Sequence, residues 1–363
     1  MVYLYMETVY YDGTKLLSMK DINGNTPEIF MVTSNRTAGK TTYFGRLLVN
    51  RYLKSGAKFI LLYRFNYELD DCAEKFFKDI QKLFFPLYEM RSESRSKGIY
   101  HELYLVDRKY DDGDNTGCSC GYAISLNSAD QIKRNSHLFS DAEAMLFDEF
   151  QSETNHYCNN EVNKFMSIHD SIARGNGKQT RYLPVYMLSN TVSVINPYYV
   201  AMGISKRLST RTKFLRGNGF VLEQGYNESA SKAMRESAFH QAFNYSKYDR
   251  YATTATYLND NSAFISKMTG RSYYLFTLRF EGKEYGVREY PDSNIVYVSD
   301  SVDETFKTKI ALDLESHDIN YVLLSRYNEY ITKLRFFFDH GCFRFKNQEC
   351  KNAIINMLCY KQI

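Results

Sequence analysis

The chain has 363 residues, with a hydrophobic fraction of 44% that is ordinary for a globular protein and a net charge of +4. This length predicts two domains, because a single hydrophobic core seldom grows beyond about 250–300 residues. The mildly basic balance permits contact with nucleic acid but does not require it. No stretch approaches about 18 uninterrupted apolar residues, and the N-terminus does not resemble a signal peptide. We therefore expect a soluble intracellular protein without a membrane span.

The seven cysteines show no pattern of a disulfide framework. Their number is odd and their spacing is irregular, whereas small disulfide-rich domains carry even sets. Cys118 and Cys120 form a single C-x-C without a second pair at zinc-finger spacing, so we expect no metal site there. Reduced thiols in a cytosolic protein are the simpler interpretation.

In the first half of the chain, predicted strands alternate with predicted helices. Short apolar runs indicate buried strands, and apolar residues at intervals of three and four indicate helices. Strands are expected at 28–33, 58–63, 103–107, 121–126, 143–148 and 183–189, and helices at 40–54, 70–85 and 157–173. This alternation predicts an α/β fold with a mainly parallel sheet and helices on both faces.

The remainder of the chain has a different character. Residues 226–257 are polar and helix-like, which suits a linker or lid. Three strands joined by tight turns are expected next, at 272–281, 283–290 and 294–299. A helix near 302–314, a strand at 319–324 and two further helices complete this part. We therefore expect three parts, namely 1–225, the linker 226–257, and a smaller α/β domain 258–363.

A phosphate-binding pattern follows the first apolar strand. Gly39, Lys40 and Thr41 match the end of G-x-x-x-x-G-K-[ST], while Ser34 replaces its first glycine. In such a P-loop, backbone N–H groups and the next helix N-terminus cradle phosphates, the lysine reaches the β- and γ-phosphates, and the threonine binds Mg²⁺. ATP and Mg²⁺ are the expected ligands, and a chance match at a helix start is the alternative. The expected nucleotide-binding residues are Ser34, Asn35, Arg36, Thr37, Ala38, Gly39, Lys40, Thr41 and Thr42.

Two carboxylates end the apolar strand at 143–148. Asp148 is placed to join Thr41 in binding Mg²⁺, and Glu149 is placed to act as the general base toward the attacking water. An aspartate and a glutamate after an apolar run are common in isolation. About a hundred residues after a P-loop, across alternating strands and helices, they indicate a nucleotide hydrolase.

Three further polar residues are candidates for sensing or completing this site. Asn190 follows the apolar strand at 183–189, where it is placed to sense the γ-phosphate; a plain turn residue is the alternative. The loop from Arg174 to Arg181 suits an arginine finger that reaches a neighbouring subunit's nucleotide, with Arg174 favoured because it adjoins the helix end. Arg36, within the P-loop, is the rival acting in its own subunit. A solvated loop or a loop that tracks DNA is the other alternative.

Taken in order, these segments resemble a known family. The loop 34–42, the strand ending in Arg64, and the segments 124–137, 146–150 and 188–199 look like those of the DNA-packaging (encapsidation) ATPases of small podophages, relatives of the terminase large subunit. The resemblance covers residues 28–225 well and the remainder only by layout.

The resemblance implies a motor built on an ASCE-type P-loop core. It implies a homo-oligomeric ring, a pentamer, that docks transiently on the portal, or connector, of a procapsid in the host cytoplasm. ATP hydrolysis would drive double-stranded DNA into this shell. Lys40 and Glu149 keep the catalytic roles given above, Arg174 matches the region of a trans-acting finger, and Lys133 or Arg134 falls where the family carries another trans-acting cation.

By the same resemblance, the C-terminal domain is similar to an RNase H-like nuclease. Two-metal nucleases need several carboxylates that converge from strand interiors and ends. The first strand of this domain contains no Asp, and Glu281 and Asp300 lie only at strand ends. We therefore expect a nuclease-inactive module that docks on the connector, DNA or a packaging RNA. A full terminase with an active nuclease and a helicase-like P-loop ATPase are the alternatives.

Overall fold

The chain divides into two compact units in the computed structural model. One comprises Met1–Met202 with Leu208–Asn259, and the other comprises Asp260–Ile363 with Gly203–Arg207. The structure describes residues 10–110, 117–154, 156–174, 179–193, 196–204, 207–208, 212–243, 252–253, 264–280, 282–312, 316–323, 329–340 and 342–359.

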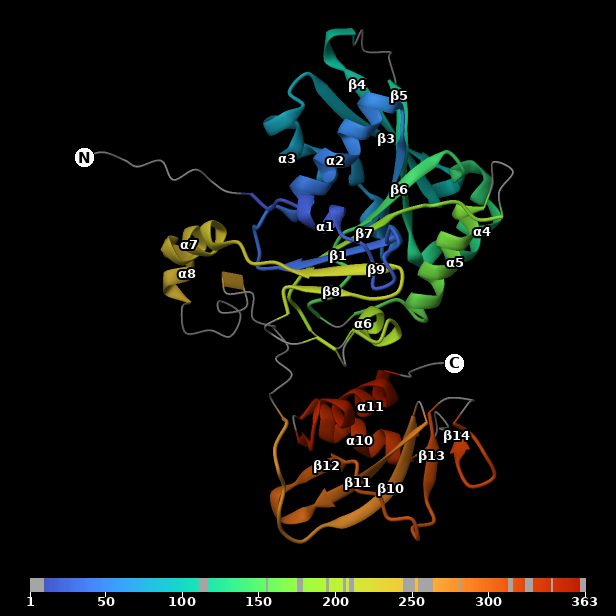
Figure 1. The fold of residues 1–363 in the computed structure, drawn as a ribbon, viewed down its shortest axis with the longest axis vertical. Helices are drawn as coiled ribbons and strands as arrows, with labels where there is room; N and C mark the ends of the chain where they lie inside the picture. Colours follow the sequence, from blue (N-terminus) through green and yellow to red (C-terminus); the bar gives the residue numbers. More distant parts are fainter. Residues whose placement is uncertain are drawn as a thin grey trace, which may run out of the picture. The chain divides into compact units, whose positions relative to one another are not determined.

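The first unit is built on a nine-stranded sheet with the order β3-β4-β5-β2-β6-β7-β1-β9-β8 (Figure 1). Neighbouring strands from β5 to β9 pair in parallel, whereas β3 and β4 extend one edge and β8 the other in antiparallel fashion. The mainly parallel sheet expected from the sequence is therefore present. The strands are β1 (Ile29–Ser34), β2 (Lys58–Tyr63), β3 (Tyr88–Arg95), β4 (Tyr100–Asp107), β5 (Cys118–Ser125), β6 (Ala142–Phe147), β7 (Val185–Asn190), β8 (Phe214–Arg216) and β9 (Phe220–Gln224).

Helices cover both faces of this sheet (Figure 1). On one face, Phe44 and Phe76 of two amphipathic helices pack against strand residues such as Leu61. On the other face, Phe147 contacts Phe165 and Tyr198. Burial on both faces explains why the central strands read as continuous apolar runs. The helices are α1 (Thr14–Ser18), α2 (Lys40–Ser55), α3 (Cys72–Phe84), α4 (Ala129–Arg134), α5 (Glu161–Ala173), α6 (Pro197–Ala201), α7 (Glu228–Glu236) and α8 (Ala238–Ala242).

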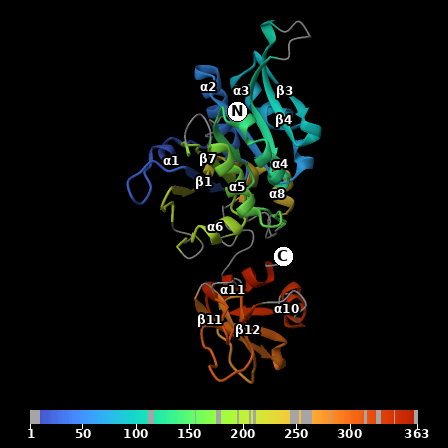
Figure 2. The ribbon, with the colours of Figure 1, turned by 90° about the vertical axis from the view of Figure 1, so that its right-hand side faces the viewer.

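The second unit has a six-stranded mixed sheet with the order β14-β13-β10-β11-β12-β15. Helices α10 (Glu329–Asp339) and α11 (Gln348–Cys359) pack on it through Leu334, Phe337 and Ile354 (Figure 2). The strands are β10 (Tyr273–Phe280), β11 (Lys283–Tyr290), β12 (Ile295–Ser299), β13 (Lys309–Ala311), β14 (Val322–Leu323) and β15 (Phe343–Phe345).

One strand was not anticipated, and one expected element was wrong. Strand β3 carries mainly charged and small polar residues, as suits an edge strand, so no apolar run marks it in the sequence. The helix expected near 302–314 is absent from described residues 302–312. Asp303 forms a local turn there, accepting hydrogen bonds from the N–H and hydroxyl of Thr305, and the chain then joins the sheet as β13 beside β10.

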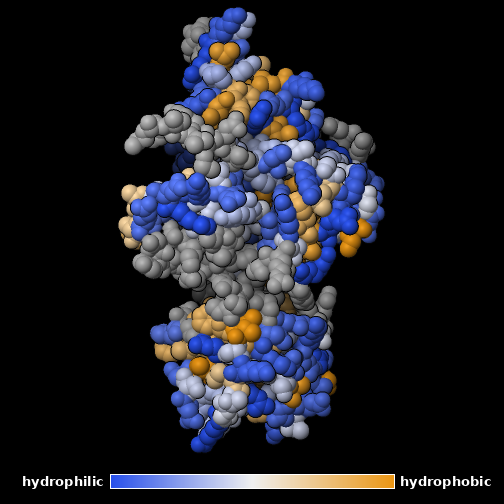
Figure 3. All heavy atoms as spheres, turned by 60° about the vertical axis from the view of Figure 1, so that its left-hand side comes forward, coloured by the Kyte–Doolittle hydropathy of each residue, from blue (hydrophilic) through white to orange (hydrophobic). Residues whose placement is uncertain are grey.

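Hydrophobic side chains form only small, separate groups on the face drawn in Figure 3. Among the residues that the structure describes, no helix is long and apolar enough to cross a membrane. The described cysteines are unpaired, and no described cluster of three His, Cys, Asp or Glu residues suits a metal ion.

A buried ion pair connects several elements of the first unit. Arg64 follows β2, and its Nε lies 2.9 Å from a carboxylate oxygen of Glu161 at the start of α5. Their side chains are only 7% and 1% exposed. Glu161 also accepts hydrogen bonds from the hydroxyl of Tyr198 at 2.9 Å and the N–H of Cys158 at 2.7 Å. Such complete pairing offsets the cost of removing both charges from water.

We predict that Glu161→Ala lowers the free energy of unfolding by about 3–5 kcal/mol, because it leaves a buried guanidinium without its partner. Urea denaturation would measure this change. Glu74→Ala is the matched control, since Glu74 and Lys78 form an exposed pair on α3, and its loss should cost less than about 1 kcal/mol. Equal effects of the two substitutions would contradict the prediction.

Candidate active site

The phosphate-binding pattern forms the turn between β1 and α2. Thr37 and Gly39 have left-handed backbone conformations, with φ of 57° and 90°. Glycine suits position 39 for a second reason, since an added Cβ would lie 2.8 Å from Cδ1 of Tyr10. Ser34 has no such requirement, because it ends β1 in parallel register with Asn190 and its φ is not positive. A serine can therefore replace the first glycine of the pattern.

Lys40 lies buried beneath this turn. Its ammonium donates hydrogen bonds to Ser34 Oγ at 2.8 Å, to the carbonyl of Asn35 at 3.3 Å and to Asn190 Oδ1 at 3.3 Å. Burial lowers the pKa of Lys40 to about 8, and the nearby carboxylate of Asp148 partly opposes this shift. The structure thus places a cation, held only by neutral oxygens, where the pattern predicts a phosphate contact.

Thr41 and Asp148 meet beside the first turn of α2. The Thr41 hydroxyl donates to Asp148 Oδ2 at 2.6 Å, although 107 positions separate the two residues. Burial raises the pKa of the Asp148 carboxyl, while the hydrogen bond from Thr41 and the charge of Lys40 act in the opposite direction. Hydroxyl and carboxylate oxygens are ligand types that Mg²⁺ takes, so these two residues fit that ion.

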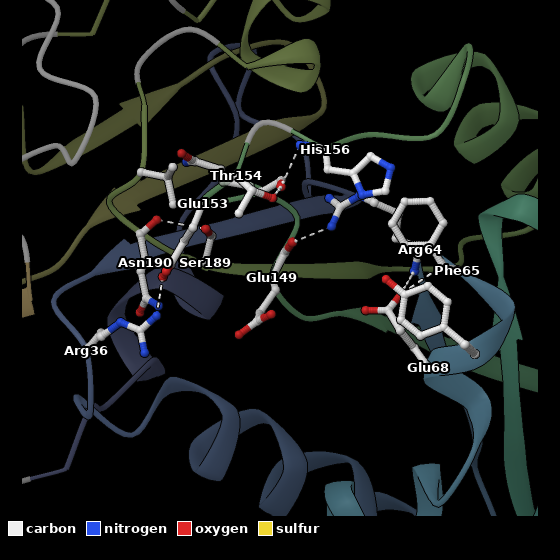
Figure 4. A pocket seen from close by; sticks show the side chains of 14 residues that line it. Arg36, Arg64, Phe65, Glu68, Glu149, Glu153, Thr154, His156, Ser189 and Asn190 are labelled. Atoms are coloured by element: carbon white, nitrogen blue, oxygen red, sulfur yellow. Dashed lines mark hydrogen bonds and ion pairs between the residues drawn. The ribbon is translucent and has the colours of Figure 1, made fainter. Parts of the chain in front are cut away.

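Glu149 projects into a pocket of about 240 Å³ at the same edge of the sheet (Figure 4). Its backbone is left-handed, with φ of 55°, and Asp148 is not among the residues that line this pocket. Desolvation raises the pKa of Glu149, and the carboxylates of Asp148 and Glu153 add to the rise. Arg36 also lines this pocket, where it forms an ion pair with Glu153. A carboxylate that holds a proton more readily is better suited to accept one from water.

Sequence reasoning missed several polar residues of this pocket. Glu68, Glu153 and His156 line it, and the Arg64 guanidinium donates to the carbonyl oxygens of Glu149 at 3.2 Å and Phe150 at 2.9 Å. A signal for Arg64 exists, because it directly follows an apolar strand, as Asp148 and Asn190 do. Glu153 and His156 lie in a loop without such a pattern.

The candidates for trans-acting cations lie away from the P-loop. Arg174 directly follows α5 and lines a second pocket, of about 520 Å³, together with residues at the amino ends of β1 and β7. The P-loop follows β1 at the carboxyl ends of the parallel strands. Arg174 lies near their amino ends, and therefore on the opposite side of the sheet from the P-loop. Arg181 is held locally, with Nη2 donating to the carbonyl of Ile172 at 3.3 Å. Most of the loop between them, residues 175–178, is outside the described residues.

The second pair of candidate cations lies on α4, which follows β5. Lys133 pairs with Asp130 of the same helix at 3.1 Å, and Arg134 is exposed. Strand β5 is separated from β1 by β2, β6 and β7, so the structure does not bring these cations to their own P-loop.

A mainly parallel α/β sheet, a P-loop with a buried lysine, and two carboxylates at the same edge define a nucleoside-triphosphate hydrolase. The family model of the Podovirus DNA encapsidation protein (Gp16) matches residues 6–363. The chain belongs to this family, and it is a DNA-packaging motor ATPase.

Individual relatives agree with the family match. The chain is 27% identical over 323 residues to the DNA packaging protein of Bacillus phage B103, covering 87% of this chain and 92% of that protein. It is 25% identical over 351 residues to that of Bacillus phage phi29, covering 95% and 96%.

Solved structures show that the fold is shared. The TM-score is 0.60 against a chain of the bacteriophage Phi-29 genome packaging motor assembly, with 23% identity and coverage of 96% and 98%. It is 0.64 against the Phi-28 gp11 DNA packaging motor, with 15% identity and coverage of 98% and 99%.

The conformation of Gly39 leads to a testable prediction. Gly39→Ala and Gly24→Ala both place a side chain at a left-handed φ, of 90° and 82°, but an added Cβ at Gly24 meets no atom within 4 Å. We predict that each lowers the free energy of unfolding by about 1–2 kcal/mol, the usual cost of this conformation. Only Gly39→Ala should weaken ATP binding, by about tenfold or more, which corresponds to a loss of about 1.4 kcal/mol. Urea denaturation and equilibrium ATP titration would measure the two effects, and equal ATP affinities would contradict the prediction.

Proposed function

We propose that the chain is the ATP-driven subunit that translocates double-stranded DNA into a procapsid, as a homo-oligomeric ring docked on the portal. One observation supports this proposal above the rest. Lys40, Thr41, Asp148, Glu149 and Asn190 come from three strand ends and meet at the carboxyl edge of one sheet. Ligands of open α/β sheets bind at this edge.

Each of these residues has a separate role in ATP hydrolysis. The buried ammonium of Lys40 binds the β- and γ-phosphates, and Thr41 and Asp148 would hold Mg²⁺. A bound Mg²⁺ supplies charge stabilisation to the transferring phosphoryl group. Glu149 accepts a proton from the attacking water, while Asn190, bonded to Lys40, senses the γ-phosphate. The P-loop core is of the ASCE type under this proposal.

Arg174 acts on a neighbouring subunit rather than on its own. Its position at the opposite edge of the sheet from the P-loop supports this role. In a closed ring of identical subunits joined head to tail, two different surfaces meet at each interface, so a residue remote from its own P-loop can lie beside that of its neighbour. Lys133 or Arg134 is a second candidate for the same kind of contact.

The C-terminal unit serves as an RNase H-like docking module without nuclease activity. Asp300 forms an ion pair with Lys346, and Asp303 accepts a hydrogen bond from the hydroxyl of Thr305. Glu281 lies outside the described residues. The unit's partner is the portal, DNA or a packaging RNA.

We predict that Glu149→Gln lowers the rate of ATP hydrolysis by about 10²–10⁴, because it removes the general base, while ATP affinity changes by less than about twofold. Phosphate release with and without duplex DNA, together with a nucleotide titration, would measure both. Glu143→Gln is the matched control, since Glu143 is an exposed carboxylate on β6, the strand that precedes Glu149. Hydrolysis by Glu149→Gln at the wild-type rate would exclude this site as the catalytic centre.

The same reactions test the C-terminal unit. Circular duplex DNA included with Mg²⁺ or Mn²⁺ should remain uncut. Cleavage by wild type that persists in Glu149→Gln would establish an active nuclease and favour the full-terminase alternative.

We predict that Arg174→Ala binds ATP normally but hydrolyses it about 10³-fold more slowly, as expected for loss of a trans-acting arginine. Mixing Arg174→Ala with Glu149→Gln should restore part of the activity, because some interfaces then combine an intact Glu149 with an intact Arg174. Arg108→Ala, an exposed arginine of the same unit, is the control. If the mixture stays inactive although the two variants co-assemble, a trans-acting role for Arg174 is excluded.

A further inference from the structure

The chain that leaves β9 runs directly beside the P-loop. Strand β9 pairs in parallel with β1 up to Gln224 opposite Thr33, and the N–H of Gly225 still donates to the carbonyl of Thr33 at 2.7 Å. Asn227 then pairs with buried Asn35 of the P-loop through two hydrogen bonds. Its N–H donates to Asn35 Oδ1 at 2.9 Å, and its carbonyl accepts from Asn35 Nδ2 at 3.0 Å.

The carbonyl oxygen of Ala38, in the same loop, is held by two donors from outside the loop. The N–H of Tyr11 lies 2.8 Å from it, and Nδ2 of Asn227 lies 3.2 Å from it. Ala38 is only 1% exposed, so water does not replace these donors. A trans peptide unit is planar, with its C=O and N–H pointing in opposite directions. Donors that hold the Ala38 carbonyl outward therefore turn the N–H of Gly39 inward.

We propose that Asn227 is a positioning residue of the nucleotide site, and that it orients the 38–39 peptide so that its N–H faces the phosphates. This inference rests on the proposed ATP site. Anion cradles of this kind depend on several backbone N–H groups that converge before the ligand arrives. A donor that fixes a peptide plane in advance removes part of the cost of ordering it during binding.

The side chain of Asn227 also caps the N-terminus of α7. Asn227 Oδ1 accepts hydrogen bonds from the N–H of Ala230 at 3.0 Å and the hydroxyl of Ser229 at 3.1 Å. The oxygen of this amide therefore caps the helix while its nitrogen holds the P-loop. This division allows the two roles to be tested separately, because serine and aspartate are also good N-cap residues but lack the amide donor.

The test uses Asn227→Ser and Asn227→Asp in the full chain, with Mg²⁺ and the non-hydrolysable analogue AMP-PNP as the probe. Loss of one hydrogen bond should raise the dissociation constant by about threefold to tenfold in both variants. The serine variant separates donor loss from the charge that aspartate adds. KM for ATP should rise by a similar factor while kcat changes by less than about twofold, because phosphate is held in both the ground and transition states.

Ser237→Ala is the matched control. Ser237 caps α8 by accepting from the N–H of His240 at 3.3 Å, and none of its hydrogen bonds reaches the P-loop. It should leave AMP-PNP affinity unchanged. An equal loss of affinity in Ser237→Ala would assign the effect to the helices and overturn the proposal.

Lys40→Ala distinguishes failure of the positioning role of Asn227 from failure of the proposed nucleotide site. If wild type binds AMP-PNP and Lys40→Ala does not, the nucleotide site is supported independently of the role of Asn227. Wild-type affinity in both Asn227→Ser and Asn227→Asp would then overturn the positioning role alone. If neither variant folds, as judged by circular dichroism, Asn227 is required for folding and not for positioning the loop, which would also overturn the proposal.

Discussion

The buried ion pair between Arg64 and Glu161 is the interaction on which the active site depends. Two charges withdrawn from water are stable only when each is well paired, so the groups that bond to them are constrained. Arg64 uses its remaining donors on the carbonyl oxygens of Glu149 and Phe150. The Glu161 carboxylate also accepts hydrogen bonds from the N–H of Cys158 and the hydroxyl of Tyr198. The end of β2, the turn after β6, α5 and α6 are thereby joined at one point.

This junction explains how Glu149 keeps an unfavourable backbone conformation. A left-handed residue other than glycine costs of order 1–3 kcal/mol and persists only where its surroundings determine it. The hydrogen bond from Arg64 to the Glu149 carbonyl is one such determinant. The two neighbouring carboxylates have different surroundings, since Asp148 accepts a hydrogen bond from Thr41 and Glu149 lines the pocket. Adjacent residues can then serve metal binding and proton transfer separately.

The sequence predicts the residues that follow apolar strands much better than the rest of the site. Lys40, Asp148 and Asn190 could be placed together because the carboxyl ends of parallel strands share one edge of a sheet. Glu153 and Asn227 could not, since no local pattern marks them and the bonds from Asn227 to the P-loop span up to 192 positions. Those contacts depend on β9 pairing with β1, and strand order is not encoded in periodicity.

The position of β1 between β7 and β9 accounts for the surroundings of the P-loop. Each neighbour runs parallel to β1, and an asparagine at or just after the end of each bonds to the loop or to its lysine. Asn190 meets Lys40 on one side, and Asn227 meets Asn35 and Ala38 on the other. Because Asn227 is the N-cap of α7, a change in the shape of the loop would alter a hydrogen bond at the start of that helix. The pairing of β1 with both neighbours thus brings Asn190 and the N-cap of α7 each within one hydrogen bond of the P-loop or its lysine.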